Sequence, residues 1–232
     1  MEGIDDKELS KIIKRNIEEN ERLVQEKLKK QKQEKVMELL NRSGLGGRFK
    51  KRTFETYNTE GITKSMLYAY NKSLEFANNF PNVEKGLLFS GTVGTGKTHL
   101  AAAIVNKLVE DMYSAAFGNA TEILTMIKSS YNKNSDYTEQ DMIKLFTDDV
   151  DMLVIDDLGK ENSTDNSIAL IYQIINRLYE HEKPIIVTTN FTSVALRKKL
   201  GEKGDAIISR LAEMCEFIKI SGEDWRMKNG TE

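Results

Sequence analysis

The stretch "GTVGTGKT" between Gly91 and Thr98 combines residue types that bind phosphate groups, at the spacing G-x-x-x-x-G-K-T. An apolar run precedes it and an alanine-rich amphipathic segment follows. Glycines let backbone N–H groups turn inward around phosphates, and a helix N-terminus adds further donors. Because the helix dipole disfavours a lysine at a helix start, the position of Lys97 indicates a strongly anionic ligand there. The sequence therefore predicts a phosphate-binding loop at the mouth of a helix.

The chemistry of such a loop predicts a bound nucleoside triphosphate with Mg²⁺. Lys97 would reach the β- and γ-phosphates, and the Thr98 hydroxyl would ligate the metal ion. The residues predicted to bind the nucleotide in this stretch are Gly91, Thr92, Val93, Gly94, Thr95, Gly96, Lys97, Thr98 and His99.

A second anchor for the metal is predicted where the apolar run "MLVIDD" ends in Asp156 and Asp157. Ligands of open parallel sheets collect at the carboxyl ends of the strands. Asp156 would hold Mg²⁺ through water, and Asp157 would polarise the attacking water as general base. Two carboxylates at this position could instead end a strand and cap a helix, an interpretation that the phosphate loop disfavours.

Two further polar residues have open alternatives. Asn190 ends the apolar run "PIIVTTN", where it would orient the same water or simply cap a helix beginning near Thr192. Arg210 lies on a helical pattern in "DAIISRLAEM" and is either a surface charge or a finger that stabilises charge on the phosphates. The residues alone do not decide between these roles.

The elements that would position these residues alternate along the chain after residue 48. The runs predicted as strands are Gly86 to Ser90, Ser114 to Asn119, Asp151 to Asp157, Pro184 to Asn190 and Glu216 to Ile220. Segments such as Thr98 to Glu110, Ala120 to Ser129 and Ser167 to Glu182 are predicted as helices. Alternation of this kind predicts an α/β fold with a parallel sheet covered by helices on both faces.

The first 47 residues differ from the rest and are predicted to form a separate helical arm. From Asp5 to about Leu40 the sequence is dense in Lys and Glu, with apolar residues at roughly helical spacing. The stretch "NRSGLGGRFKKR" then breaks this pattern and indicates a linker. The predicted domains are thus residues 1–47 and 48–232. The arm is either a solvated charged helix or a helix that binds a partner, and its otherwise unused apolar stripe favours the partner.

Composition excludes several classes of protein. The chain has 232 residues, 39% hydrophobic and 30% charged, and no apolar run long enough to span a bilayer, so we expect a cytoplasmic protein without a membrane segment. Its net charge of −2 gives no global attraction to nucleic acid. Cys215 is the only cysteine, which excludes an intrachain disulfide and a Cys-rich zinc site. We expect Cys215 to be a packed strand residue.

The stretches "FSGTVGTGKTHLAAAI", "DMLVIDDLG", "TTNF" and "ISRL" resemble the DnaC/DnaI-type helicase loaders, AAA+ ATPases that deliver a replicative helicase to DNA. The resemblance extends from Arg52 to Arg226 and is shared in part by the IstB-type ATPases that assist transposases. It implies an AAA+ P-loop core preceded by the arm. Because the sequence ends at Glu232, we expect no full helical lid of the kind that many AAA+ proteins carry. The arm has no cysteines for the zinc domain of the DnaI type, and looks more like the helical region of the DnaC branch or of a phage-encoded relative.

The resemblance also implies roles for individual residues. Asn190 would be a sensor of the nucleotide, Arg210 an arginine finger that reaches the ATP of a neighbouring copy, and Arg226 a second sensor. Phe54 and Tyr57 fall in the segment that approaches the adenine in the family. An arginine finger that acts on the ATP of a neighbouring copy implies a homo-oligomer in the ATP-bound state.

A DNA contact is implied by the segment "MIKSSYNK", which looks like the family's stretch where an aromatic residue meets single-stranded DNA. This singles out Tyr131, because an exposed Tyr can stack on any base. The alternative is a Tyr packed at the end of its helix.

The sequence therefore predicts an ATP-dependent helicase loader that binds single-stranded DNA and, through its arm, a replicative ring helicase. Hydrolysis would act as a release switch. The alternatives are a transposase-assisting ATPase of the IstB type and a non-hydrolysing adaptor that sequesters a replication protein.

Overall fold

The computed structural model describes residues 6–42, 49–132, 137–161 and 164–225, and is built around one sheet of five parallel strands. The strands are β1 (Gly86–Gly91), β2 (Ala115–Asn119), β3 (Met152–Asp156), β4 (Ile185–Thr189) and β5 (Cys215–Ile220). Their order across the sheet is β2-β3-β4-β1-β5, and every neighbouring pair is parallel. The predicted parallel α/β sheet is confirmed, and every strand end lies within one residue of the predicted one.

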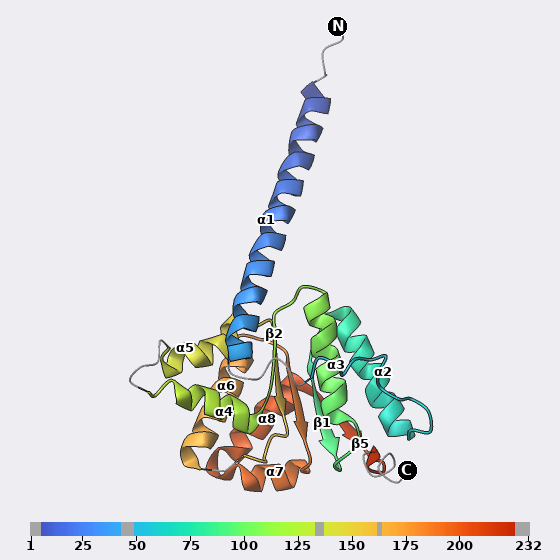
Figure 1. Ribbon diagram of the computed structural model, residues 1–232, viewed down its shortest axis with the longest axis vertical. Coiled ribbons are helices and arrows are strands. Elements are labelled where there is room, and N and C mark those ends of the chain that lie inside the picture. The colour runs from blue at the N-terminus through green and yellow to red at the C-terminus, as the bar shows by residue number, and fades with distance from the viewer. Residues whose placement is uncertain (1–5, 43–48, 133–136, 162–163, 226–232) are drawn as a thin grey trace.

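Helices cover both faces of this sheet (Figure 1). One face carries α2 (Lys64–Asn79) and α3 (Lys97–Glu110), whose apolar residues pack with Leu87, Phe89 and Val154. On the opposite face, other helices pack against Leu88 and Leu153 of the sheet. The elements there are α4 (Ala120–Ser129), α5 (Glu139–Lys144), η1 (Leu145–Asp149), α6 (Asp165–Glu180), α7 (Ser193–Lys199), η2 (Gly201–Lys203) and α8 (Gly204–Met214). Because successive strand residues point to opposite faces, each apolar strand contributes to both layers of the core.

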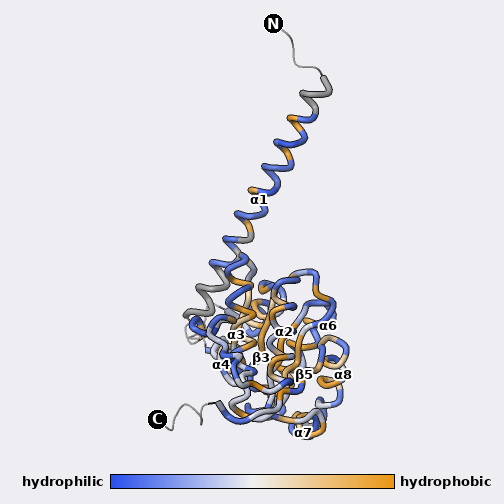
Figure 2. Tube along the Cα trace, turned by 90° about the vertical axis from the view of Figure 1, so that its right-hand side faces the viewer, coloured by the Kyte–Doolittle hydropathy of each residue, from blue (hydrophilic) through white to orange (hydrophobic). Residues whose placement is uncertain are grey.

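The N-terminal arm is a single helix, α1 (Asp6–Arg42), which projects away from the sheet (Figure 1). Its hydrophobic residues lie between hydrophilic ones along its length, as Figure 2 shows. Ile13, Ile17, Val24 and Leu28 are each at least half exposed. Within the part of the chain that the structure describes, every long helix, α1 included, is too polar to cross a membrane.

The C-terminal part of α1 contacts the core through Gln33, whose side chain is 8% exposed. Its Nε2 atom donates to the carbonyl of Val109 at 2.9 Å and to that of Tyr113 at 3.4 Å. These carbonyls lie at the end of α3 and in the turn before β2, where a helix leaves acceptors without intrahelical partners. The arm is therefore fastened to the core near its end. The predicted linker falls largely on residues 43–48, outside the described residues.

Cys215 lies at the start of β5 and is 2% exposed. Burial raises the pKa of its thiol to about 12. The prediction that Cys215 is a packed strand residue is confirmed.

Candidate nucleotide-binding site

The loop from Gly91 to Thr98 connects β1 to α3, as predicted. Gly96 precedes α3 in the left-handed conformation, with φ of 88°. A Cβ atom at Gly96 would come within 2.8 Å of the Tyr57 ring, so both conformation and space call for glycine there. Tyr57 thus supports the loop from behind, and burial raises the pKa of its phenol to about 12.

Lys97 is 4% exposed and lies against this loop. Its Nζ atom donates to the carbonyls of Gly91 and Thr92, at 2.9 and 2.6 Å. A buried ammonium needs such acceptors, because burying a charge without them costs much free energy. The loop therefore holds a positive charge beside the N-terminus of α3, which is the arrangement that an anionic ligand requires.

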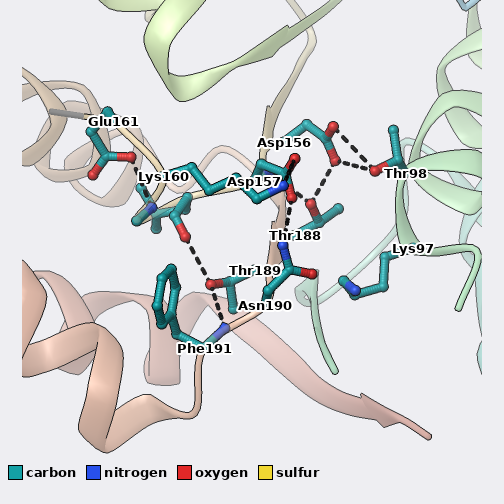
Figure 3. A network of polar contacts seen from close by, with 12 residues as sticks. Lys97, Thr98, Asp156, Asp157, Lys160, Glu161, Thr188, Thr189, Asn190 and Phe191 are labelled. Carbon is teal, nitrogen blue, oxygen red and sulfur yellow. Dashed lines mark hydrogen bonds and ion pairs between the residues drawn. The ribbon is translucent and has the colours of Figure 1, made fainter. Parts of the chain in front are cut away.

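Asp156 ends β3 and is 5% exposed. The Thr98 hydroxyl donates to its Oδ1 atom at 2.8 Å, and the Thr188 hydroxyl donates to the same atom at 2.6 Å (Figure 3). Burial raises the pKa of the Asp156 carboxyl above its usual range, although both hydroxyls and Arg52 act in the opposite direction. A buried carboxylate beside a loop threonine is the donor set expected for Mg²⁺ on a nucleotide.

Asp157 follows β3 in a backbone conformation that is uncommon outside glycine, with φ of 56°. Its amide donates to the Thr188 hydroxyl at 2.9 Å, which turns the side chain toward the pocket. Asn190 donates to the Oδ1 atom of Asp157 at 3.0 Å, and the ammonium of Lys160 lies 2.6 Å from Oδ2 (Figure 3). The predicted base and the predicted sensor are thus in direct contact.

These residues line one pocket with a volume of about 360 Å³. The predicted residues that line it are Val93, Gly94, Thr95, Gly96, Lys97, Thr98, His99, Asp156, Asp157 and Asn190. Residues that the sequence analysis missed also line it, namely Phe49, Arg52, Asn119, Lys160 and Trp225. A loop, a helix start and the ends of three strands, β2, β3 and β4, converge there, at the carboxyl edge of the sheet.

His99 fastens the segment before α2 to the start of α3. Its Nε2 atom lies 2.9 Å from the carbonyl oxygen of Thr53 and 3.2 Å from the Thr56 hydroxyl. Burial lowers the pKa of His99, so the neutral ring is favoured. Its ring stands edge-on to Tyr57.

The segment after β5 crosses the phosphate loop. The amide of Trp225 donates to the carbonyl of Gly94 at 3.2 Å, and the Thr92 hydroxyl donates to the carbonyl of Gly222 at 3.4 Å. Trp225 is the only tryptophan of the sequence, and its place in the pocket wall carries no motif that could have predicted it.

Phe54 does not line the pocket. It is 7% exposed and packs edge-on against Tyr70 in the core layer of α2 and α3. Tyr57 stands behind Gly96, outside the pocket lining. The residues of this segment that face the pocket are instead Phe49 and Arg52.

Arg210 lies on α8, outside this pocket, and is held against α6. Its Nε atom donates to Asn176 at 2.8 Å, and its Nη2 atom donates to the Tyr172 hydroxyl at 3.2 Å. The guanidinium also lies 5.0 and 5.5 Å from the ring centres of Tyr172 and Tyr179. For Arg210 to contact another copy of the chain, its guanidinium would have to extend from this cluster of α6 side chains.

Tyr131 follows α4, also away from the pocket, and is 50% exposed. Its hydroxyl donates to the carboxylate of Glu139 at the start of α5, which raises the pKa of the phenol. Its ring is therefore partly accessible while its hydroxyl is engaged. Arg226, the predicted second sensor, lies outside the described residues.

Comparison with known proteins places these features in a family. The model of the family described as "IstB-like ATP binding protein" matches residues 13–232, nearly the whole chain. The chain belongs to this family. Its similarity to DnaC-type loaders is also confirmed: it is 31% identical over 176 residues to the replicative helicase loader DnaC of Buchnera aphidicola subsp. Baizongia pistaciae, covering 76% of this chain and 70% of the relative.

Two further matches agree. DnaC of Escherichia coli strain K12 is 30% identical over 169 residues, covering 73% of this chain and 67% of the relative. The crystal structure of the DnaC helicase loader superposes with a TM-score of 0.64 at 29% identity, covering 75% of this chain and 98% of that one. The predicted AAA+ fold is thereby confirmed.

Proposed function

We propose that this protein is an ATP-dependent helicase loader. The observation that carries the ATPase part is the convergence of Lys97, Thr98, Asp156, Asp157 and Asn190 on one pocket. The loader part is supported by the similarity to proteins named replicative helicase loader DnaC. In this proposal ATP binding favours assembly on single-stranded DNA and on a ring helicase, and hydrolysis releases them.

In the proposed site, the amides of the phosphate loop and Lys97 bind the phosphates, while Thr98 and Asp156 hold Mg²⁺. The fit is supported by the burial of Asp156, which disfavours its charge unless a cation or donors compensate. Bound Mg²⁺ would neutralise part of the phosphate charge. Asp157 accepts a proton from the attacking water, and Asn190 orients the Asp157 carboxylate and that water.

Arg210 is proposed to act on the ATP of a neighbouring copy, so that the ATP-bound protein is a homo-oligomer. Its position outside its own pocket is compatible with this role. Mixing Arg210→Ala protein with Lys97→Ala protein tests it, because one supplies an intact pocket and the other an intact finger. If oligomers form and the mixture stays inactive, Arg210 serves only to pack α8 on α6.

Tyr131 is proposed to stack on single-stranded DNA, an interaction supported by its half-exposed ring. Loss of one stacking aromatic costs on the order of 1–3 kcal/mol of binding free energy. Fluorescence anisotropy at matched salt should show weaker binding by Tyr131→Ala. The control, Tyr131→Phe, keeps the ring while losing the bond to Glu139, and should bind nearly as well. Equal binding by Tyr131→Ala would contradict the role.

The arm is proposed to bind the helicase, since α1 exposes an apolar stripe that the core does not cover. A chain that begins near Arg48 should keep ATP binding and lose the helicase. A pull-down from native cell extract, followed by mass spectrometry, decides between partners. Recovery of a transposase without a ring helicase would favour the transposase-assisting alternative of the IstB type.

The ATPase assignment is tested separately. Lys97→Ala should lose nucleotide binding, and Asp157→Asn should bind ATP without turning it over. Lys107→Ala is a suitable control, because its ammonium pairs with Asp111 on the far part of α3. Full activity in either pocket variant would rule out this chemistry, and failure of both to hydrolyse alongside an active control would support it.

A further inference from the structure

Lys160 is a charged residue of the pocket, and binding of phosphates and Mg²⁺ in the proposed reaction does not require it. It lies three residues after Asp157, and its amide donates to the carbonyl of Asp157 at 3.1 Å, closing a turn. Gly159 occupies the third position of the turn with φ of 95°, as a type II turn requires. The turn brings the two side chains together: Nζ of Lys160 lies 2.6 Å from Oδ2 of Asp157 (Figure 3).

The turn itself is fastened on several sides. The amide of Leu158 donates to the carbonyl of Thr188, and the Thr189 hydroxyl donates to the carbonyl of Leu158, both at 2.8 Å. The carboxylate of Glu161, which is 2% exposed, accepts from the amide of Gly159 at 2.8 Å. The pairing of Lys160 with Asp157 therefore rests on a backbone tied to β4, so only the side chains have to be ordered when the pair forms.

The carboxylate of Asp157 is held at both oxygens. Asn190 donates to Oδ1, and Lys160 donates to Oδ2. A carboxylate offers about four acceptor positions, so each oxygen keeps capacity for a water molecule. Fixing both oxygens sets the plane of the group and hence the direction in which it can accept a proton from water.

A purely structural role would give this ion pair little purpose. The side chains of Lys160 and Asp157 are 49% and 27% exposed, and pairs with this much exposure typically stabilise a fold by about 1 kcal/mol or less. Both residues nevertheless line the pocket with Lys97 and Asn190. The position points to catalysis.

We propose that Lys160 is a positioning residue for ATP hydrolysis, acting through Asp157. The proposal rests on the proposed ATPase function and deepens it. Lys160 and Asn190 together aim the Asp157 carboxylate at the attacking water. In the step they serve, the water gives one proton to Asp157, its oxygen bonds to the γ-phosphorus, and the bond from that phosphorus to the leaving oxygen of ADP breaks. ATP and water thus yield ADP, phosphate and a proton.

The test compares single-turnover hydrolysis and ATP affinity in the full chain. Lys160→Ala should lower the hydrolysis rate about ten-fold or more, since a positioned base contributes roughly 10²–10⁴-fold and only its aim is lost. Its Kd for ATP, measured with a fluorescent ATP analogue, should change less than about two-fold on the same reasoning. Lys160→Arg should recover part of the rate, because it restores a cation within reach of Asp157.

The matched control is Lys107→Ala, which removes another Lys–Asp pair, with an N···O distance of 2.7 Å, outside the pocket. It should hydrolyse ATP like the unchanged protein. If Lys160→Ala keeps the full rate, the proposal is wrong; if its Kd weakens in step with its rate, Lys160 binds nucleotide instead. Should Lys97→Ala also stay active, it is the proposed ATPase function that fails.

Discussion

Two leucines in this chain have opposite surroundings: Leu153 on the interior strand β3 is fully buried, whereas Leu28 on α1 is 60% exposed. The same contrast holds for the arm and the core as wholes. Apolar residues of the core form two continuous layers, while those of α1 face solvent for much of its length. The core can be stable through its own burial; the arm has to draw its stability from local interactions or from a partner.

The local interactions of α1 are weak. Lys14 pairs with Glu18 at 4.0 Å and Arg22 with Glu26 at 3.8 Å, with all four side chains at least 63% exposed. Helical pairs of this type contribute about 0.3–0.5 kcal/mol each. Helix propensity of its Lys, Glu and Leu residues adds to this, as does the contact at Gln33. The arm thus combines a helical fold with an uncovered stripe.

The largest expected effect lies in the core. Leu153→Ala removes a buried side chain from β3 and leaves a cavity, which should lower the free energy of unfolding by about 2–5 kcal/mol. Urea denaturation followed by circular dichroism measures the change. An effect below about 1 kcal/mol would mean that the two layers of the core can collapse around the missing atoms.

A smaller effect is expected where the arm meets the core. Gln33→Ala removes the donor to Val109 and Tyr113, and should cost about 1 kcal/mol of stability at this junction. Hydrogen exchange should rise in the C-terminal part of α1 and at the end of α3. Gln25→Ala, an exposed position on the same helix, is the control. Equal exchange in the two variants would mean that the arm is not fastened by Gln33.

The smallest effect is expected on the stripe. Leu28→Ala should change the free energy of unfolding by less than about 0.5 kcal/mol, because the side chain is already in contact with water. The same denaturation experiment, paired with Leu153→Ala, measures the contrast directly. If Leu28→Ala were as costly as Leu153→Ala, the stripe would have to be covered, for instance by a second copy of the chain.

The parts of the fold that could be predicted from sequence are those governed by local pattern. Apolar runs of strand length and amphipathic segments give the alternation of the core, and the phosphate loop has a spacing that few other structures require. Asp156, Asp157 and Asn190 followed from the rule that ligands gather at the carboxyl ends of parallel strands. Their convergence needed no knowledge of distant contacts.

Residues that depend on tertiary contacts were missed. Phe49, Arg52 and Trp225 reach the pocket from segments remote in sequence, and nothing in their neighbours predicts it. Lys160 did carry a sequence signal. Gly159 is suited to the third position of a turn that begins at Asp157, and such a turn brings the side chains of Asp157 and Lys160 together. Gln33 is one of many polar residues in the arm, and only the fold shows which of them meets the core.

The contact at Gln33 also connects movements of α3 to movements of the arm. The phosphate loop begins α3, and the other end of α3 carries the carbonyl that Gln33 binds. From Gln33 to Asp6 the helix α1 extends for about 40 Å at 1.5 Å per residue. A rotation of α1 by about 10° about Gln33 would move Asp6 by about 7 Å, on the same helix geometry. A displacement of α3 too small to disturb the packing of the sheet would thus become, at Asp6, a movement as large as the width of a side chain.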